Sequence, residues 1–155
     1  MYTSITVSQV LRAKGQGFHA IGPDASAYDA LGIMAEHNIG ALLVVEGGRL
    51  IGVFSERDYA RKVILKGRSS KETPVRELMS SPPITVGMDA TMRDCMVLMT
   101  RNRVRHLPVI DHDVPRGVVS IGDVVNTIIS EQEKMIDDLE SYIAGNEYTR
   151  ESVSS

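Results

Sequence analysis

Apolar and polar residues alternate along the chain in a pattern that predicts short strands and helices in a fixed order. From residue 19, the predicted elements are an extended segment at 19–21, a helix from Ser26 to about His37, strands at 42–45 and 50–54, and a helix that begins at Ser55. Gly47 and Gly48 stand between the two strands, where a tight hairpin requires positive φ angles. The order of elements is therefore β-α-β-β-α.

The same order occurs a second time further along the chain. The predicted elements are an extended segment at 84–86, a helix from Thr91 to about Arg101, strands at 107–110 and 117–119 with a turn at 112–116, and a helix from Ser120. Short helical segments precede the two copies at 7–11 and 75–79. After residue 125, apolar residues recur every three or four positions among charged ones, which predicts an amphipathic helix.

The two copies form an internal repeat with a constant offset. Residues 24–60 align without a gap on residues 89–125, 65 positions later, and ten of the 37 pairs are identical. Because a repeated unit buries its apolar face against its twin, we predict a mixed α/β (α+β) fold with a pseudo-twofold axis and two equivalent clefts. The expected boundaries are 7–65 for the first repeat, 66–74 for a linker, 75–130 for the second repeat, 131–144 for a C-terminal amphipathic helix and 145–155 for a disordered tail.

Composition and charge narrow the range of functions. The chain has 155 residues, of which 43% are hydrophobic, enough for one sizeable core or two small ones. The net charge of -3 gives no general reason to bind nucleic acid or an anionic membrane, and no apolar run approaches the roughly 18 to 20 residues of a membrane span. Cys95 is the only cysteine, and the N-terminus lacks the pattern of a secretory signal. We therefore expect a soluble protein in a reducing compartment, the cytoplasm if the source is bacterial.

Both copies contain the motif G-h-h-S-x-x-D, in which h is an apolar residue, at 52–58 and 117–123. The serine and the aspartate have the spacing of a capping box, which satisfies free amide groups at the start of a helix. The same spacing occurs at 26–29 and 91–94 without the preceding strand, and there we interpret it as a helix cap. At the motif a second interpretation is open, because a strand–helix junction offers amide donors to a phosphate and the carboxylate can accept the two hydroxyls of a ribose.

The duplicated unit and its motif resemble a tandem pair of CBS domains, also called a Bateman module, over about residues 7–129. Three strings, at 55–62, 66–70 and 102–109, are similar to stand-alone CBS-pair proteins of bacteria and their relatives in plant organelles. The resemblance implies a regulatory protein that binds adenosine-containing ligands in two clefts, AMP first, with ADP, ATP, NAD or S-adenosylmethionine as other ligands. It also implies a homodimer that acts in signal transduction or energy sensing on an unidentified effector protein or enzyme.

The resemblance also assigns residues to the two clefts. Asp58 and Asp123 would hold the ribose hydroxyls. The two motif serines would lie beside ribose or phosphate, and the extended segment that enters each repeat would contact adenine through its backbone. The residues expected at the first cleft are Ala20, Ile21, Ser55, Arg57, Asp58 and Arg61. Those expected at the second cleft are Ile84, Val86, Val104, Arg105, His106, Pro108, Ser120 and Asp123.

The two clefts are expected to differ in charge. Residues 103–106 are Arg-Val-Arg-His where the first copy has Asn-Ile-Gly-Ala, whereas Arg57 and Arg61 align with neutral residues of the second copy. His106, beside Arg105, is interpreted as a phosphate contact. Because phosphates approach each other near the axis of such a module, the sequence leaves open which cleft receives Arg105 and His106.

Other functions are weighed against nucleotide binding. The chain has no Ser, His and Asp arrangement with a supporting motif and no acid–base pair kept in both copies, so we expect no catalysis. The four histidines are scattered, which argues against a metal site, and Cys95 lies on an apolar helix face and is expected in the core. The alternative is a structural dimerisation module with vestigial clefts. The helix after residue 130 would either strengthen a dimer or dock a partner.

Overall fold

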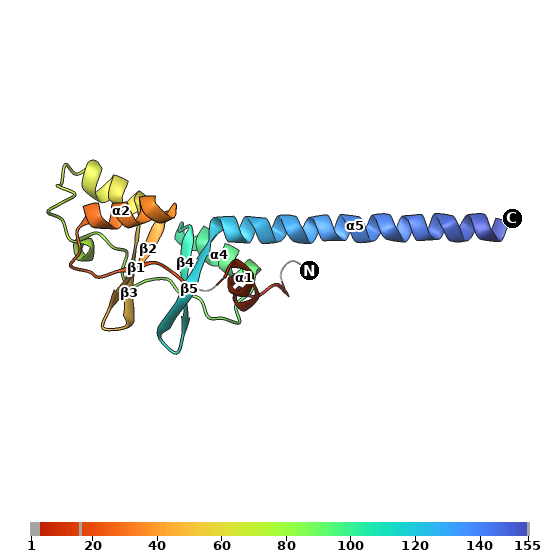
Figure 1. Ribbon diagram of the computed structural model, residues 1–155, viewed down its shortest axis with the longest axis horizontal. Helices are drawn as coiled ribbons and strands as arrows, with labels where there is room; N and C mark the ends of the chain where they lie inside the picture. Colours follow the sequence, from red (N-terminus) through yellow and green to blue (C-terminus); the bar gives the residue numbers. More distant parts are fainter. Residues whose placement is uncertain (1–3, 16, 155) are drawn as a thin grey trace.

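The protein consists of two similar halves and one long helix (Figure 1). The computed structural model describes residues 4–15 and 17–154, with side chains described up to residue 145. Its elements are α1 (Val7–Lys14), β1 (Ala20–Ile21), α2 (Ala27–His37), β2 (Ala41–Glu46), β3 (Arg49–Ser55), α3 (Glu56–Tyr59), the π-helix η2 (Ala60–Ile64), the 3-10 helix η3 (Val75–Glu77), α4 (Met92–Asn102), β4 (His106–Asp111), β5 (Val114–Ser120) and α5 (Ile121–Ser154). The predicted order of elements is confirmed in the first copy, and in the second it is confirmed except that the segment 84–86 forms an isolated bridge at Val86 instead of a strand.

The two halves repeat each other in the details of strand pairing. β1 pairs in parallel with β2, and β2 and β4 pair antiparallel with β3 and β5. In the second half an isolated parallel bridge between Val86 and Val109 takes the place of the pair Ile21 and Val44, 65 positions earlier. Both hairpins have a register shift directly after the equivalent residues Val44 and Val109. The pseudosymmetric two-repeat fold is therefore confirmed.

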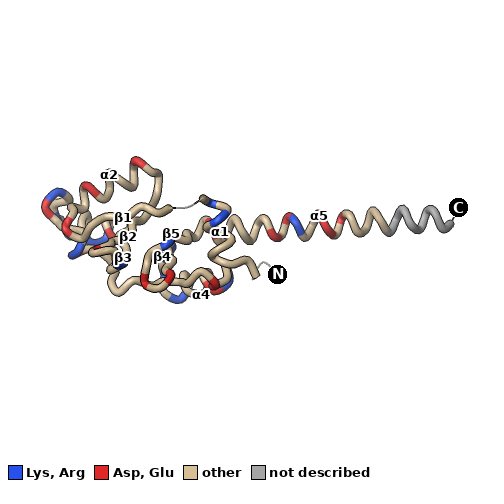
Figure 2. The backbone as a smooth tube through the Cα atoms, turned by 60° about the horizontal axis from the view of Figure 1, so that its bottom comes forward, with Lys and Arg blue, Asp and Glu red and all other residues tan. Residues whose placement is uncertain are grey.

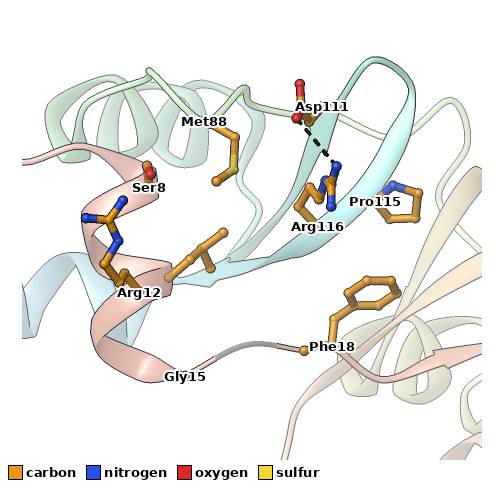
Figure 3. Close-up of a pocket in the computed structure, with 10 residues that line it drawn as sticks. Ser8, Arg12, Gly15, Phe18, Met88, Asp111, Pro115 and Arg116 are labelled. Carbon is orange, nitrogen blue, oxygen red and sulfur yellow. Dashed lines mark ion pairs between the residues drawn. The ribbon is translucent and has the colours of Figure 1, made fainter.

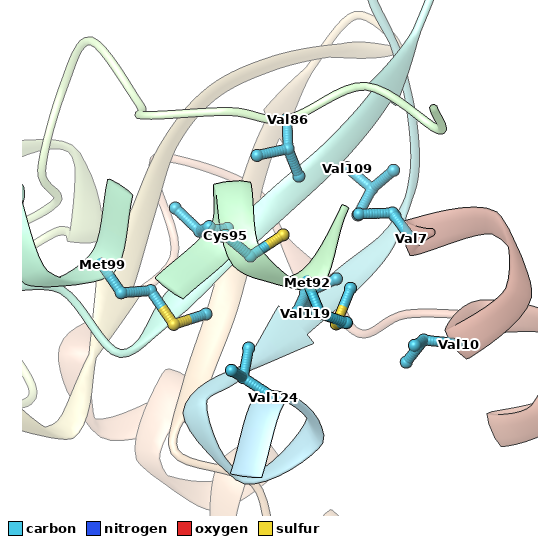
Figure 4. Packing of buried hydrophobic residues seen from close by; sticks show 10 residues of the cluster. Val7, Val10, Val86, Met92, Cys95, Met99, Val109, Val119 and Val124 are labelled. Carbon is cyan, nitrogen blue, oxygen red and sulfur yellow. The ribbon is translucent and has the colours of Figure 1, made fainter. Parts of the chain in front are cut away.

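Each half has its own hydrophobic core, and each core is completed by the short helical segment that precedes the other half. Val75 and Leu78 are fully buried in the core of the first half. Val7 and Val10 of α1 are buried in the core of the second half (Figure 4), and α1 contacts β5. In space, α1 therefore belongs with the second half, although the sequence boundary 7–65 groups it with the first.

The glycine that opens each motif allows these exchanged segments to approach the sheets. A Cβ atom on Gly52 would lie 2.6 Å from Sδ of Met79 and 3.0 Å from the carbonyl oxygen of Ser80. A Cβ atom on Gly117 would lie 2.9 Å from Cδ2 of Leu11. Neither position accepts a side chain unless its neighbour moves, so the first residue of the motif has a packing role.

α5 differs from the expected boundaries. It begins at Ile121, inside the second repeat, and continues without interruption to Ser154, so the segment expected as a disordered tail is helical up to residue 154. Gly145 opposes a helix there by only about 1 kcal/mol, and the polar residues that follow are compatible with one. Of the residues described, no helix is both long and apolar enough to span a membrane.

Candidate functional site

The two motifs lie at equivalent junctions, where β3 meets α3 and where β5 meets α5. The N–H of Ser55 donates to Oδ2 of Asp58 over 3.0 Å, and the N–H of Asp58 donates to Oγ of Ser55 over 3.1 Å. The equivalent distances for Ser120 and Asp123 are 2.8 and 3.1 Å. Both motifs therefore form complete capping boxes, and capping alone does not distinguish them from an ordinary helix start.

The environment of the two motif carboxylates does distinguish the motifs from an ordinary helix start. The capping box at the start of α4 has matching distances of 3.0 and 3.1 Å, but its carboxylate, Asp94, is exposed and forms no ion pair within the described part of the chain. The side chains of Asp58 and Asp123 are each only 15% exposed, and each forms an ion pair with a lysine. Nζ of Lys62 lies 3.3 Å from Oδ1 of Asp58, and Nζ of Lys14 lies 2.8 Å from Oδ2 of Asp123.

The exchanged segments supply part of each carboxylate's surroundings. Lys14, at the end of α1, also donates to the carbonyl oxygen of Val118 over 3.0 Å. Oγ of Ser80, just after η3, lies 3.4 Å from Oδ1 of Asp58. The sequence analysis missed Lys14 and Ser80, because both reach the motif only through the exchange. The one available signal was the short helical segment before each copy.

Residues at the boundary between the halves come mainly from the two motifs and from the starts of β2 and β4. β3 and β5 contact each other, and Nη1 of Arg57 donates across the boundary to the carbonyl oxygen of Arg103 over 3.0 Å. Gly40, which aligns with Arg105, lies beside His106: a Cβ atom on Gly40 would be 3.4 Å from the imidazole Cε1. A larger residue at position 40 would press on this ring.

His106 is the titratable residue at this boundary whose pKa is shifted. Burial lowers the pKa of its imidazole below the ordinary value. The charge of Glu56 from the first half opposes that effect, Arg105 and Lys14 lower the pKa further, and Asp123 raises it. The charges that act on the imidazole thus come from both halves, Glu56 from the first and Asp123 with its lysine from the second motif. The expected difference between the two clefts stays a prediction.

Three of the residues expected at the clefts, Ile21, Val86 and Pro108, are buried in the sheets and cores. The N–H of Val86 donates to the carbonyl oxygen of Pro108 over 3.0 Å, and its carbonyl oxygen accepts from the N–H of Ile110 over 2.9 Å. Both backbone polar groups of Val86 are therefore bonded within the second half.

The other expected residues differ in how accessible they are. Ile84 and Val104 are partly buried and pack against the second core. Ala20, Arg61 and Arg105 are exposed. The structure thus brings together Ser120, Asp123 and His106 with Arg105 nearby, whereas Arg57 extends toward the second half.

A pocket of about 440 Å³ lies elsewhere, between α1, the segment before β1 and the β4–β5 hairpin (Figure 3). Arg116 faces into it and forms a loose ion pair with Asp111 at 3.7 Å, and Phe18 and Met88 supply apolar walls. The pocket is near the turn of the hairpin, while Ser120 lies at the opposite end of β5. It contains none of the residues expected at the two clefts.

Cysteine and metal chemistry are not prominent in the structure. Cys95 is fully buried, as expected, and burial raises the pKa of its thiol to about 11. Within residues 4–15 and 17–145, whose side chains the structure describes, no three His, Cys, Asp or Glu side chains are grouped so that they could hold a metal ion.

Comparison with known proteins identifies the fold. The family model of the CBS domain matches residues 16–64 and 75–130, one segment in each half. The chain belongs to the CBS-domain family. Among curated proteins, the mitochondrial CBS domain-containing protein CBSX3 of Arabidopsis thaliana is 41% identical over 153 residues, covering 93% of this chain and 74% of the relative.

Two solved CBS structures are similar throughout the two halves. The CBS domain protein NE2398 is 45% identical, with a TM-score of 0.76 over 80% of this chain and 97% of that one. A protein with CBS domains from Burkholderia ambifaria is also 45% identical, with a TM-score of 0.78 over 82% and 96% of the two chains. The two halves described above are therefore a tandem CBS pair.

Proposed function

We propose that this CBS pair binds adenine nucleotides, AMP first, in the clefts beside Asp58 and Asp123 and thereby regulates a partner protein. The observation that carries the proposal is the environment of the two carboxylates. Each lies at a strand–helix junction, is mostly buried and forms an ion pair with a lysine. A carboxylate that only caps a helix needs neither feature, as the exposed Asp94 illustrates. ADP, ATP, NAD and S-adenosylmethionine contain the same adenosine group and are the other ligands proposed.

Binding requires acceptors for the ribose and cations for the phosphate. Oδ1 of Asp123 accepts no hydrogen bond from the described residues, so it can accept from a ribose hydroxyl in a charge-assisted bond. The Lys14 and Lys62 side chains are 42% and 43% exposed, so their ammonium groups can turn from the carboxylates toward a phosphate. Arg61 adds a cation at the first cleft and Arg105 adds one near the second, and Arg57 reaches the first cleft by releasing its hydrogen bond to the carbonyl oxygen of Arg103.

The regulatory part of the proposal rests on location and on similarity. A ligand at the boundary of the two halves contacts both. It can change the effect of the protein on a partner only if it binds one arrangement of the halves more tightly than another. The Burkholderia protein is provisionally described as a signal-transduction protein, which agrees with such a role. The cytoplasmic location stays a prediction, and the Arabidopsis relative is named as mitochondrial.

Calorimetry of the full-length chain with AMP tests nucleotide binding. Asp58→Ala and Asp123→Ala should each weaken one cleft by roughly 10- to 150-fold, equivalent to about 1.5 to 3 kcal/mol, because a charged acceptor is lost. Asp94→Ala is the matched control, since it removes an equal capping box outside the motif and should leave AMP affinity unchanged.

The outcome against the proposal is equally defined. If the double variant Asp58→Ala/Asp123→Ala remains folded and binds AMP, ATP and NAD as the unmodified chain does, the motif is only a pair of helix caps. If the unmodified chain binds none of the five ligands, the protein is a structural dimerisation module with vestigial clefts.

A further inference from the structure

α5 leaves the second half and carries an apolar stripe that no other described part of the chain covers. Val124 is buried and Ile128 packs against the second core, so the start of the helix is fixed to the body. Further along, the helix extends away from both halves (Figure 1). The relative exposure of Val125, Ile129 and Ile136 is 45%, 47% and 53%, and it stays at this level to Ile143.

The spacing of this stripe is that of a coiled coil. Its positions alternate at intervals of four and three residues, a period of 3.5, and we call these six residues the α5 seam: Val125, Ile129, Gln132, Ile136, Leu139 and Ile143. In the heptad abcdefg, Ile129, Ile136 and Ile143 occupy the a positions, and Val125, Gln132 and Leu139 occupy the d positions. Isoleucine at a favours two parallel strands where leucine stands at d, as at Leu139. The seam spans about 27 Å of helix at 1.5 Å per residue.

The charges beside the seam distinguish a parallel pair from an antiparallel one. The e positions include Glu133 and Glu140, whereas the g positions are the uncharged Ile128, Met135 and Tyr142. In a parallel pair each e position faces a g position of the partner, and in an antiparallel pair e faces e. Only the parallel arrangement keeps the glutamates of the two helices apart.

The overall charge of α5 argues in the same direction. On the part of α5 whose side chains are described, acidic residues outnumber basic ones, and Lys134 is the one basic residue (Figure 2). Two such helices repel each other wherever their charged faces meet, so they can associate only through the uncharged seam and its g side. This restricts the geometry to one in which the seams face each other.

We propose that α5 pairs in parallel and in register with α5 of a second copy through the α5 seam. The twofold axis runs along the seam, so Gln132 meets Gln132 of the second copy. Gln132 is the one polar residue of the seam, and in register its side-chain amide can donate to the amide oxygen of Gln132 of the second copy, so this alignment leaves no seam amide facing only apolar side chains. The CBS pairs of both copies then lie at the same end of the coiled coil.

Disulfide trapping in the full-length chain tests the pairing and its direction. Leu139→Cys places a thiol at a d position, where a parallel in-register pair brings two thiols together, and oxidation should link most of the protein into dimers of about 34 kDa, twice 17.0 kDa. The native Cys95 is fully buried and should not compete. Adding Ile136→Glu should reduce this linkage at least tenfold, because it puts a charge into the seam. Adding Ser141→Glu, with the same charge on the opposite face, should leave it unchanged.

Sedimentation equilibrium of the chain without the added thiol completes the test. We expect a dimer at micromolar concentration whose dissociation constant rises at least tenfold with Ile136→Glu and not with Ser141→Glu. A monomeric chain would overturn the proposal. So would a dimer that ignores Ile136→Glu, or one that persists while Leu139→Cys fails to cross-link. None of these outcomes depends on nucleotide binding, so the proposed function is tested separately.

Discussion

At the scale of single residues, His106 is the side chain whose chemistry depends most on the meeting of the two halves. Its imidazole is partly buried beside Gly40, and burial lowers its pKa in the folded protein. In the unfolded chain the imidazole has an ordinary pKa near 6.5. The unfolded chain therefore binds more protons as the pH falls, and stability is lost below about pH 6.5 while it is unaffected by this group at higher pH.

Urea unfolding between pH 7.5 and pH 5.0 measures this effect. For a single group the free energy of unfolding should fall by at most about 1.4 kcal/mol per pH unit. His106→Gln should remove that component and flatten the pH dependence, whereas His19→Gln, at an exposed position, should keep it. Equal pH dependence in the unmodified chain and in His106→Gln would mean that the imidazole titrates normally in the folded protein.

The candidate site also divides at this scale into predictable and unpredictable residues. The pairs Ser55 with Asp58 and Ser120 with Asp123 follow from local spacing, and the structure forms both capping boxes. Lys14 was not predictable, because its contact with Asp123 joins residues 109 positions apart and depends on where α1 packs. Local patterns specify the hydrogen bonds within one turn of helix, while charge pairs between distant segments require the fold.

At the scale of elements, the strands and helices were largely predictable and their partners were not. Gly47 and Gly48 have positive φ angles of 60° and 78°, as the hairpin interpretation required. The apolar residues of α1 give the same helical pattern whichever half they pack on, so the exchange with the second half was invisible in the sequence. The end of α5 was misjudged because polar composition is compatible with both helix and disorder.

The exchange predicts unequal effects for the two motif glycines. Gly52→Ala should destabilise the protein by about 1 to 3 kcal/mol, because its Cβ would meet a backbone carbonyl as well as Met79. Gly117→Ala should cost less, since Leu11 is a flexible side chain, and adding Leu11→Ala should remove the overlap. Gly32→Ala in α2 is the control: it has open space and should stabilise by about 1 kcal/mol. Equal urea midpoints for Gly52→Ala and Gly32→Ala would contradict this account of the exchange.

At the scale of the whole molecule, the exchange makes the two CBS repeats one folding unit. A chain divided after residue 70 gives a first fragment without Val75 and Leu78 and a second without Val7 and Val10. Each fragment loses two buried aliphatic side chains, worth about 3 to 6 kcal/mol in total, which is a large part of the 5 to 15 kcal/mol that stabilises typical domains. We therefore expect neither fragment to fold alone.

Amide chemical-shift dispersion in NMR spectra of fragments 1–70 and 71–155 provides the measurement, since helicity retained by α5 does not contribute to it. Each fragment alone should give collapsed spectra, and an equimolar mixture should recover the dispersed spectrum of the intact chain because each fragment carries the segment that completes the other's core. The chain 17–155 is the informative control, for it keeps Val75 and Leu78 but lacks α1, so dispersion should be lost mainly for the second half. A well-dispersed spectrum of fragment 71–155 alone would show that the second core is stable without α1, and the repeats would then be independent domains joined by a linker.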